Sequence, residues 1–140
     1  MLILDTNVLS EIMKASPFPR VMEWWSQQHS GDLFTTTVTM AEILYGIELL
    51  PKGKRRDSLR HEAEVVFAQD LDGRILAFDE DAAQVYSRIA ATRRLQGRPI
   101  AYFDAQIAAI AICRGASLAT RDIADFEGCN LRLIDPWGRE

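Results

Sequence analysis

The chain has 140 residues, of which 48% are hydrophobic and 26% charged, and its formal net charge is −4. A chain of this length buries roughly two-thirds of its unfolded surface, so we expect residues 1–140 to form a single domain. The acidic balance argues against a protein that coats nucleic acid through bulk electrostatic attraction. Asp5 interrupts the N-terminal apolar run, and no later run is long enough to cross a bilayer, so we expect no secretory leader and no membrane span.

The chain has two cysteines, Cys113 and Cys129. They form no CxxC motif and no histidine pattern accompanies them, so neither a zinc site nor a disulfide framework is supported. We therefore expect a protein of the reducing cytoplasm.

Taken in chain order, apolar periodicity and turn residues predict strands that alternate with helices. The first strand, 2–4, precedes helices over 8–13 and 19–29, and the second, 33–36, precedes helices over 39–50 and 54–69. The third strand, 75–78, precedes helices over 81–96 and 101–114, and strands over 118–119 and 131–134 complete the pattern. Helices between successive strands require parallel pairing with right-handed crossovers. The predicted fold class is therefore an α/β three-layer sandwich, α/β/α, with a central, mostly parallel sheet.

Four carboxylates follow predicted strands or lie in early helical turns: Asp5, Glu42, Asp104 and Asp122. Each has a structural explanation as a turn or cap residue, and the spacing of Thr39 and Glu42 fits a capping box. In a parallel sheet, however, the carboxyl ends of the strands open on one edge, where the four side chains can converge. Four converging carboxylates with no interleaved Lys or Arg repel one another, and a divalent metal is the natural counterion. All-oxygen ligation favours Mg²⁺ or Mn²⁺.

The segments that carry these acids resemble, in order and spacing, the PIN-domain family, and most of all its VapC/FitB-like toxins of bacterial type II toxin–antitoxin systems. They read Leu-Ile-Leu-Asp5-Thr6-Asn7, Thr39-Met-Ala-Glu42, Asp104-Ala-Gln-Ile-Ala-Ala and Ala119-Thr120-Arg121-Asp122. The ending Asp135-Pro136-Trp137 is similar to the FitB-like branch, so the resemblance covers essentially the whole chain.

The resemblance implies a Mg²⁺- or Mn²⁺-dependent ribonuclease with an acidic metal site made of Asp5, Glu42, Asp104 and Asp122. It also implies that Thr120 is a supporting hydroxyl, while Asp125 is a second candidate for the fourth acidic position. The bulky pair Tyr102 and Phe103 stands where relatives frequently have small residues, which affects the expected shape of the RNA groove rather than the metal site. Hydrolysis by metal-activated water leaves 5′-phosphate ends. His29 and His61 fall outside the motifs, which disfavours a histidine route through a 2′,3′-cyclic phosphate.

The same resemblance implies a cytoplasmic homodimer that a small antitoxin neutralises by covering or filling the acidic groove, with DNA contacted only through that antitoxin. Two other functions stay open at this point. A PIN-like module can work by binding alone, through an antitoxin and DNA, without catalysis. A phosphotransferase with Asp5 as nucleophile is disfavoured, because Asn7 stands where that chemistry needs a second acid.

Two basic clusters are either solvated helix surface or a positive rim that holds the RNA backbone. The first contains Lys52, Lys54, Arg55, Arg56 and Arg60, and the second contains Arg88, Arg93, Arg94 and Arg98. We expect charge reversal at Arg55 and Arg56 to weaken RNA binding and leave metal binding intact.

Overall fold

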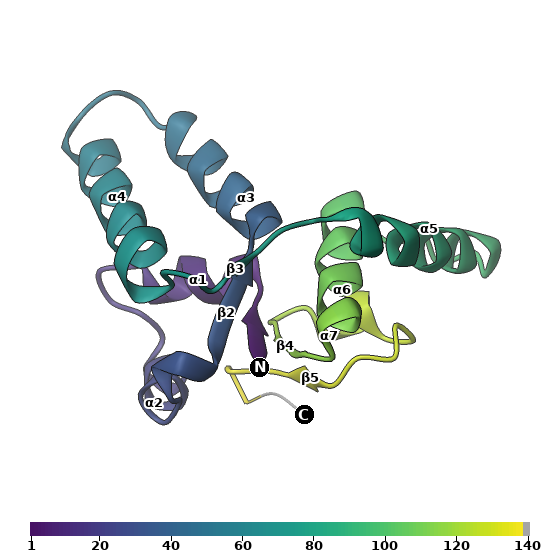
Figure 1. The fold of residues 1–140 in the computed structure, drawn as a ribbon. Helices are drawn as coiled ribbons and strands as arrows, with labels where there is room; N and C mark the ends of the chain where they lie inside the picture. The colour runs from purple at the N-terminus through teal and green to yellow at the C-terminus, as the bar shows by residue number, and fades with distance from the viewer. Residues whose placement is uncertain (139–140) are drawn as a thin grey trace.

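The structure, a computed structural model, describes residues 1–138 and is built around a five-stranded sheet (Figure 1). The central strand β1, Leu2–Leu4, pairs with β2, Leu33–Thr36, on one side and with β4, Ser117–Ala119, on the other. The edge strands β3, Ile75–Leu76, and β5, Leu133–Ile134, complete the order β3-β2-β1-β4-β5. Every pair is parallel. The sheet grows from β1 to one side and then to the other, and in open α/β sheets the ligand crevice lies at such a switch point, beyond the carboxyl ends of the strands.

Helices cover both faces of the sheet, which confirms the predicted three-layer sandwich (Figure 1). One layer contains α1 (Thr6–Ile12), α2 (Pro19–Ser26), α3 (Thr37–Glu48) and α4 (Lys54–Val65). The other contains α5 (Glu80–Leu95), α6 (Tyr102–Arg114) and the short α7 (Ile123–Phe126). Side chains alternate along β1, so Leu2 and Leu4 pack with the first layer and Ile3 packs with the second.

Several element boundaries differ from those predicted, and local hydrogen bonds explain two of the shifts. α1 begins at Thr6 rather than at residue 8, because the Asp5 side chain accepts a hydrogen bond from the Thr6 N–H and caps the helix. α3 begins at Thr37 because Thr36 is its cap, with Oγ1 accepting from the Thr39 N–H (3.1 Å). The capping box between Thr39 and Glu42, offered as a structural explanation for that acid, is therefore wrong.

The remaining differences concern edge strands and helix ends. The edge strands β3 and β5 have two residues each, where the predicted strands have four. The long helix predicted over 54–69 is α-helical to Val65 and continues as a π-helix, Val66–Asp70. A 3₁₀ helix, Ser30–Asp32, precedes β2, and the four-residue α7 lies in a segment for which no helix was predicted.

Small side chains let α6 pack closely against the second face of the sheet. Its buried residues are Ala105, Ile107, Ala108, Ala109, Ile110 and Ala111. The helix ends at Gly115, whose φ of 63° is readily adopted only by a residue without a Cβ. This packing places the first turn of α6, with Asp104, at the edge where β1 and β4 end. Within residues 1–138, no helix has the length and apolar character needed to span a membrane.

Candidate active site

Asp5 lies at the carboxyl end of β1, where the backbone turns from strand into helix. Its N–H donates to the Ala119 carbonyl of β4 (2.9 Å), and its Oδ1 accepts from the Thr6 N–H (2.8 Å). The residue is only 3% exposed. The carboxylate is thus anchored at the junction of the two central strands, which is the switch point of the sheet.

Thr120 follows β4 and links two of the predicted site acids. Its buried hydroxyl donates to Asp5 Oδ2 (2.7 Å) and accepts from the Asp122 N–H (3.1 Å). One hydroxyl therefore orients the Asp5 carboxylate and fixes the backbone that carries Asp122. This is the geometry of a positioning group, because the hydroxyl acts through the carboxylates.

The first turn of α1 supplies two more positioning side chains. Asn7 Nδ2 donates to Asp122 Oδ2 (3.0 Å) and, at greater distance, to Asp5 Oδ2 (3.3 Å). Thr6 Oγ1 donates to Glu42 Oε1 (2.9 Å). Glu42 lies in the second turn of α3, so the bond from Thr6 brings it to the edge that already holds Asp5 and Asp122. Thr6 and Asn7 therefore both orient neighbouring carboxylates.

Asp104 comes from the opposite layer and is half-buried in the first turn of α6. Burial raises the pKa of Asp104 to about 7, with further contributions from the negative charges of Asp5, Asp125, Glu42 and Asp122. No group within residues 1–138 donates a hydrogen bond to its carboxylate. The structure therefore brings Asp104 into the same acidic field as the other predicted site residues and leaves it without a donor.

The Asp5 carboxyl responds to the same environment. Burial raises the pKa of Asp5, while the hydrogen bonds from Thr120 and Thr6 oppose that rise. The charges of Glu42 and Asp122 add to it. The pKa of both carboxyls is raised first by burial and then by neighbouring negative charge, and a bound cation would offset that charge.

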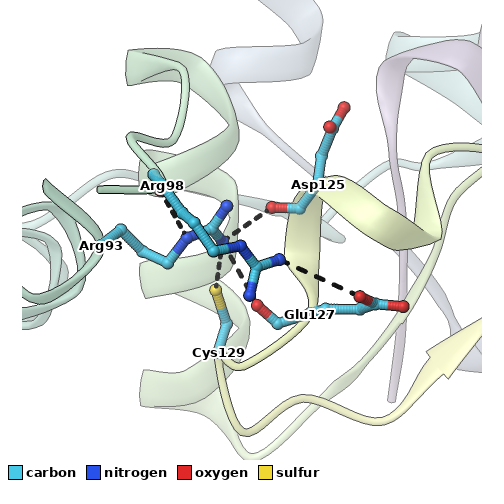
Figure 2. A network of polar contacts seen from close by, with 5 residues as sticks. All are labelled: Arg93, Arg98, Asp125, Glu127 and Cys129. Carbon is cyan, nitrogen blue, oxygen red and sulfur yellow. Dashed lines mark hydrogen bonds and ion pairs between the residues drawn. The ribbon is translucent and has the colours of Figure 1, made fainter. Parts of the chain in front are cut away.

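Asp125, the second candidate after Asp122 for the fourth acidic position, lies near the same acids. Its charge helps to raise the pKa of Asp104, and α7, which carries it, is held by Arg93 of α5 (Figure 2). The Arg93 guanidinium donates to the carbonyls of Asp125 (3.0 Å), Glu127 (3.3 Å) and Arg98 (2.8 Å). Figure 2 shows the Asp125 carboxylate pointing away from Arg93, so the cation fixes the backbone and does not pair with this acid.

The basic clusters are only partly what the sequence predicted. Arg93 is 7% exposed, so both predicted roles, solvated surface and RNA rim, are wrong for this residue. Arg56 and Arg60 are ion-paired with Glu48 (2.7 and 2.6 Å). Arg55 is exposed and forms no ion pair or hydrogen bond within residues 1–138. Arg55, together with the exposed Lys52 and Lys54, is therefore available to an anionic ligand, whereas Arg56 and Arg60 are paired.

Other predicted features lie around the acidic site. Tyr102 and Phe103 occupy the first two positions of α6, directly before Asp104, and are 76% and 52% exposed. His29 and His61 are exposed, and neither is hydrogen-bonded to a carboxylate of the site. Cys113 and Cys129 are free thiols, and the buried Cys129 Sγ lies 3.7 Å from Arg93 Nη1 (Figure 2).

The donor chemistry of this edge fits a divalent cation. Within residues 1–138, no three Asp, Glu, His or Cys side chains enclose a metal site as they lie, so the coordination sphere is not preformed. All the available donors are nevertheless carboxylate oxygens, and no Lys, Arg or His of the described chain is ion-paired with any of them. The residues that could hold Mg²⁺ or Mn²⁺ are the predicted four, Asp5, Glu42, Asp104 and Asp122, with Asp125 beside them.

Comparison with known proteins identifies the family of this chain. The family model described as PIN domain matches residues 2–127. The plasmid stability protein StbB of Pseudomonas syringae is 40% identical, over 98% of this chain and 99% of its own. VapC ribonuclease Y4jK of Sinorhizobium fredii is 39% identical over 98% of each chain, and toxin FitB of Neisseria gonorrhoeae is 35% identical over 98% and 99%.

A solved structure agrees with these relatives. The FitAB complex bound to an IR36 DNA fragment contains a chain with a TM-score of 0.92 and 35% identity, covering 100% of this chain and 98% of that one. The chain described here belongs to the PIN domain family, and the expected resemblance to VapC and FitB toxins is confirmed.

Proposed function

We propose that this chain is a divalent-metal-dependent endoribonuclease and the toxin of a toxin–antitoxin pair. The proposal depends on one observation: five carboxylates share one edge of the sheet, and their charges act on one another with no paired cation among the described residues. Two similar chains, VapC ribonuclease Y4jK and toxin FitB, carry names that fit this activity.

The division of work follows from the hydrogen bonds. Mg²⁺ or Mn²⁺ would be held by Asp5, Glu42, Asp104 and Asp122. When bound, the cation supplies an activated water and neutralises charge on the scissile phosphate and the departing 3′-oxygen. Thr120 and Asn7 hold Asp5 and Asp122 in fixed orientations, as partners of metal ligands commonly do. Cleavage of the P–O3′ bond by water leaves 5′-phosphate and 3′-hydroxyl ends.

Two other chemistries are less compatible with this edge. Cleavage through a 2′,3′-cyclic phosphate with histidine as general acid and base is disfavoured, because both histidines lie on exposed surface without a bond to the acids. Phosphoryl transfer to Asp5 needs an accessible nucleophile, yet Asp5 is 3% exposed and both of its oxygens accept hydrogen bonds.

The binding-module alternative remains the second candidate because a similar chain occurs in a complex named FitAB on DNA. On that alternative the chain would reach DNA only through its antitoxin. All four predicted acids are present, and the charges of Asp5, Glu42 and Asp122 act on Asp104, which favours catalysis.

The proposal includes expectations about the substrate, the partners and the cellular location. The substrate is RNA, the regulator is a cognate antitoxin, and the assembly is a homodimer in the cytoplasm that antitoxin binding can enlarge. Size measurement by light scattering, with and without co-expressed antitoxin, tests the assembly.

The test of function is cleavage of a 5′-labelled structured RNA by the purified chain in Mg²⁺ or Mn²⁺. We expect cleavage that EDTA abolishes and that Asp5→Asn lacks, while the matched variant Asp72→Asn, at an exposed turn residue, cleaves like wild type. End analysis should find 5′-phosphates. Identical products from wild type and Asp5→Asn would reject the activity as contamination, and cyclic-phosphate ends would reject the mechanism.

A further inference from the structure

A cavity of about 300 Å³ lies between α5, α6 and the turn that follows α7. Three aliphatic side chains of the two helices line it, Val85, Ile89 and Ile112, together with the cationic Arg88 and Arg93. Within residues 1–138, no Asp or Glu is among the residues that line it. The cavity therefore combines apolar walls with positive charge and has no carboxylate of its own.

Arg93 is a buried cation without a carboxylate partner. It is 7% exposed, and it forms no ion pair with any residue of the described chain. Its guanidinium donates to the carbonyls of Arg98, Asp125 and Glu127 and lies 3.7 Å from the Cys129 sulfur, and all four of these groups are neutral (Figure 2). Buried charges are ordinarily paired. The wall of the cavity therefore holds a positive charge that an anionic ligand would neutralise.

One nitrogen of this guanidinium is still available to a ligand. The hydrogen bonds of Arg93 use Nε and Nη1, and none of them uses Nη2. In the part of the chain that the structure describes, the one fully buried polar side-chain atom without a hydrogen bond is Arg56 Nε, so Arg93 Nη2 is open to solvent. Nη2 can thus donate to a ligand without breaking any of the bonds that hold α7.

Arg88 and two short polar side chains add donors around the same cavity. Arg88 and Thr92 are four residues apart, on one face of α5, and Asn130 lies in the turn after α7. All three are exposed, and none has a side-chain hydrogen bond or ion pair within residues 1–138. Guanidinium, hydroxyl and amide groups all donate to phosphate oxygens, and the guanidinium bonds are the strongest of these.

We propose that this cavity binds one nucleotide of the RNA substrate at a distance from the cleaved bond, with its phosphate at Arg88 and Arg93 and its base against Ile89 and Ile112. The volume lies at the lower end of the roughly 300–1,000 Å³ typical of small-molecule sites. A phosphate ion alone would leave the aliphatic walls uncovered, whereas a nucleotide matches both the charge and the apolar surface.

The position of the cavity favours RNA as the occupant. Ile112 follows Asp104 by eight residues on α6, which is about 12 Å along a helix. Three or four nucleotides span that distance at roughly 3.4 Å per stacked nucleotide. Arg93 joins the two places directly, because it lines the cavity and also holds α7, which carries Asp125. The proposal rests on the ribonuclease function proposed above and adds an RNA-binding site outside the acidic edge.

The direct test is titration of the purified chain with AMP, CMP, GMP and UMP, followed by NMR of the backbone amides. EDTA in the buffer keeps the acidic edge free of metal, so that nucleotides are not recruited there. We expect at least one nucleotide to shift the resonances of Ile89, Thr92 and Asn130. Inorganic phosphate should bind about tenfold more weakly, because it covers no apolar surface.

Two variants and two matched controls locate the site. Thr92→Trp places a large side chain at the cavity and should weaken nucleotide binding about tenfold or more, and Arg88→Gln should weaken it about fivefold. Ala91→Trp and Arg94→Gln make the same changes at α5 residues that do not line the cavity, and they should leave the affinity near that of wild type. All four positions are exposed, so the melting temperatures should stay close to that of wild type. Arg93 is kept because it supports α7.

RNA cleavage in Mn²⁺ distinguishes this site from the function on which it rests. For an RNA that extends well beyond the cleaved bond on both sides, Thr92→Trp and Arg88→Gln should raise KM about fivefold or more and leave kcat unchanged. For an RNA trimmed to about two nucleotides on each side, both variants should cleave like wild type, because that RNA is too short to reach the cavity.

Each remaining outcome decides a different part of the proposal. No nucleotide-induced shift at these residues would overturn the cavity and leave the ribonuclease standing. Equal affinity for phosphate and nucleotides would overturn it in favour of a simple anion site. Mononucleotide binding with an unchanged KM for the long RNA would overturn it in favour of a free nucleotide as the occupant. Binding of nucleotides and RNA at these residues in a chain that cleaves no RNA would support the site and contradict the ribonuclease.

Discussion

The two halves of the acidic site are built differently. On the side of β1 and β4, Asp5 accepts hydrogen bonds from Thr6, Thr120 and Asn7, and the Asn7 amide also reaches Asp122. On the side of α6 and α7, neither Asp104 nor Asp125 receives a hydrogen bond at its carboxylate from the described chain. We call the first side the fixed half and the second, whose carboxylates receive no hydrogen bond from the described chain, the mobile half.

This difference explains why the described residues form an acidic site without a preformed metal coordination sphere. The hydrogen-bonded carboxylates give a bound cation a fixed position, and the unbonded carboxylates can move toward it at little cost in lost bonds. The Asp104 carboxyl, with a pKa raised to about 7 by burial and neighbouring charge, is the most responsive member. Substitutions in the two halves should therefore have different effects on activity, metal affinity and stability.

The largest effect is expected at the fixed half. Asp5→Asn should lower kcat/KM for RNA about a thousandfold or more, a loss expected for a preorganised charged group, and asparagine can still cap α1. Asp125→Asn, in the mobile half, should lose about tenfold. Steady-state cleavage of one RNA by both variants tests the ranking, and equal losses would contradict a division into fixed and mobile halves.

The next effect concerns the hydroxyl that joins Asp5 to Asp122. Thr120→Val keeps the shape of the side chain and removes both hydrogen bonds, so metal affinity should fall about 10- to 100-fold. Thr120→Ser should recover most of it, because the hydroxyl returns. Calorimetric metal titration measures the change, and a valine variant that binds like wild type would show that the bonds do not position the acids.

The third effect concerns Arg93, which supports the α7 segment of the mobile half. Arg93→Met removes the buried guanidinium that donates to the carbonyls of Asp125 and Glu127, which should cost about 2 kcal/mol of unfolding free energy. Arg94→Met, at an exposed neighbour on α5, should cost less than about 0.5 kcal/mol. Urea denaturation compares the two. Equal stability in both variants would show that the network in Figure 2 does not hold α7.

The smallest effect is a pH dependence from Asp104. Its pKa rises from 3.8 to about 7 on folding, so between these values the folded state binds a proton that the unfolded state releases. Metal-free stability should therefore fall as the pH rises through this window and level off above it. Asp104→Asn should lack the decline and be about 1 kcal/mol more stable at pH 8, a value reduced for the screening of a half-exposed group. Melting curves from pH 5 to 8 in EDTA test this, and parallel curves would contradict it.

The sequence was informative wherever a local pattern determines geometry. Short apolar strands separated by helices predicted the parallel sheet, and the position of Asp5 directly after β1 predicted its place at the sheet edge. The two-residue edge strands were predicted too long because pairing on one side only, not composition, sets their length. The capping explanation of Glu42 failed because Thr36, the last residue of the predicted strand, is the real cap of α3.

The roles of Arg93 and Asp125 depend on long-range packing that no local pattern reveals. Arg93 is separated by more than thirty residues from the two α7-segment carbonyls it binds, and a run of arginines on a helix ordinarily indicates exposed surface. Asp125 lies in a four-residue helix that is too short to give a periodic signal. The contact of Asn7 with Asp5 and Asp122 was easier to predict from the sequence, since an amide two residues after Asp5 in the first helical turn faces the same edge.

The central claim is that the fixed and mobile carboxylates together hold one divalent cation. Calorimetric titration of the purified chain with Mn²⁺ at pH 8, above the pKa of Asp104, tests it directly. We predict one saturable site in wild type and at least tenfold weaker binding in both Asp5→Asn and Asp104→Asn, with Asp72→Asn unchanged. Wild-type affinity in both site variants would contradict the claim and remove the metal from the mechanism.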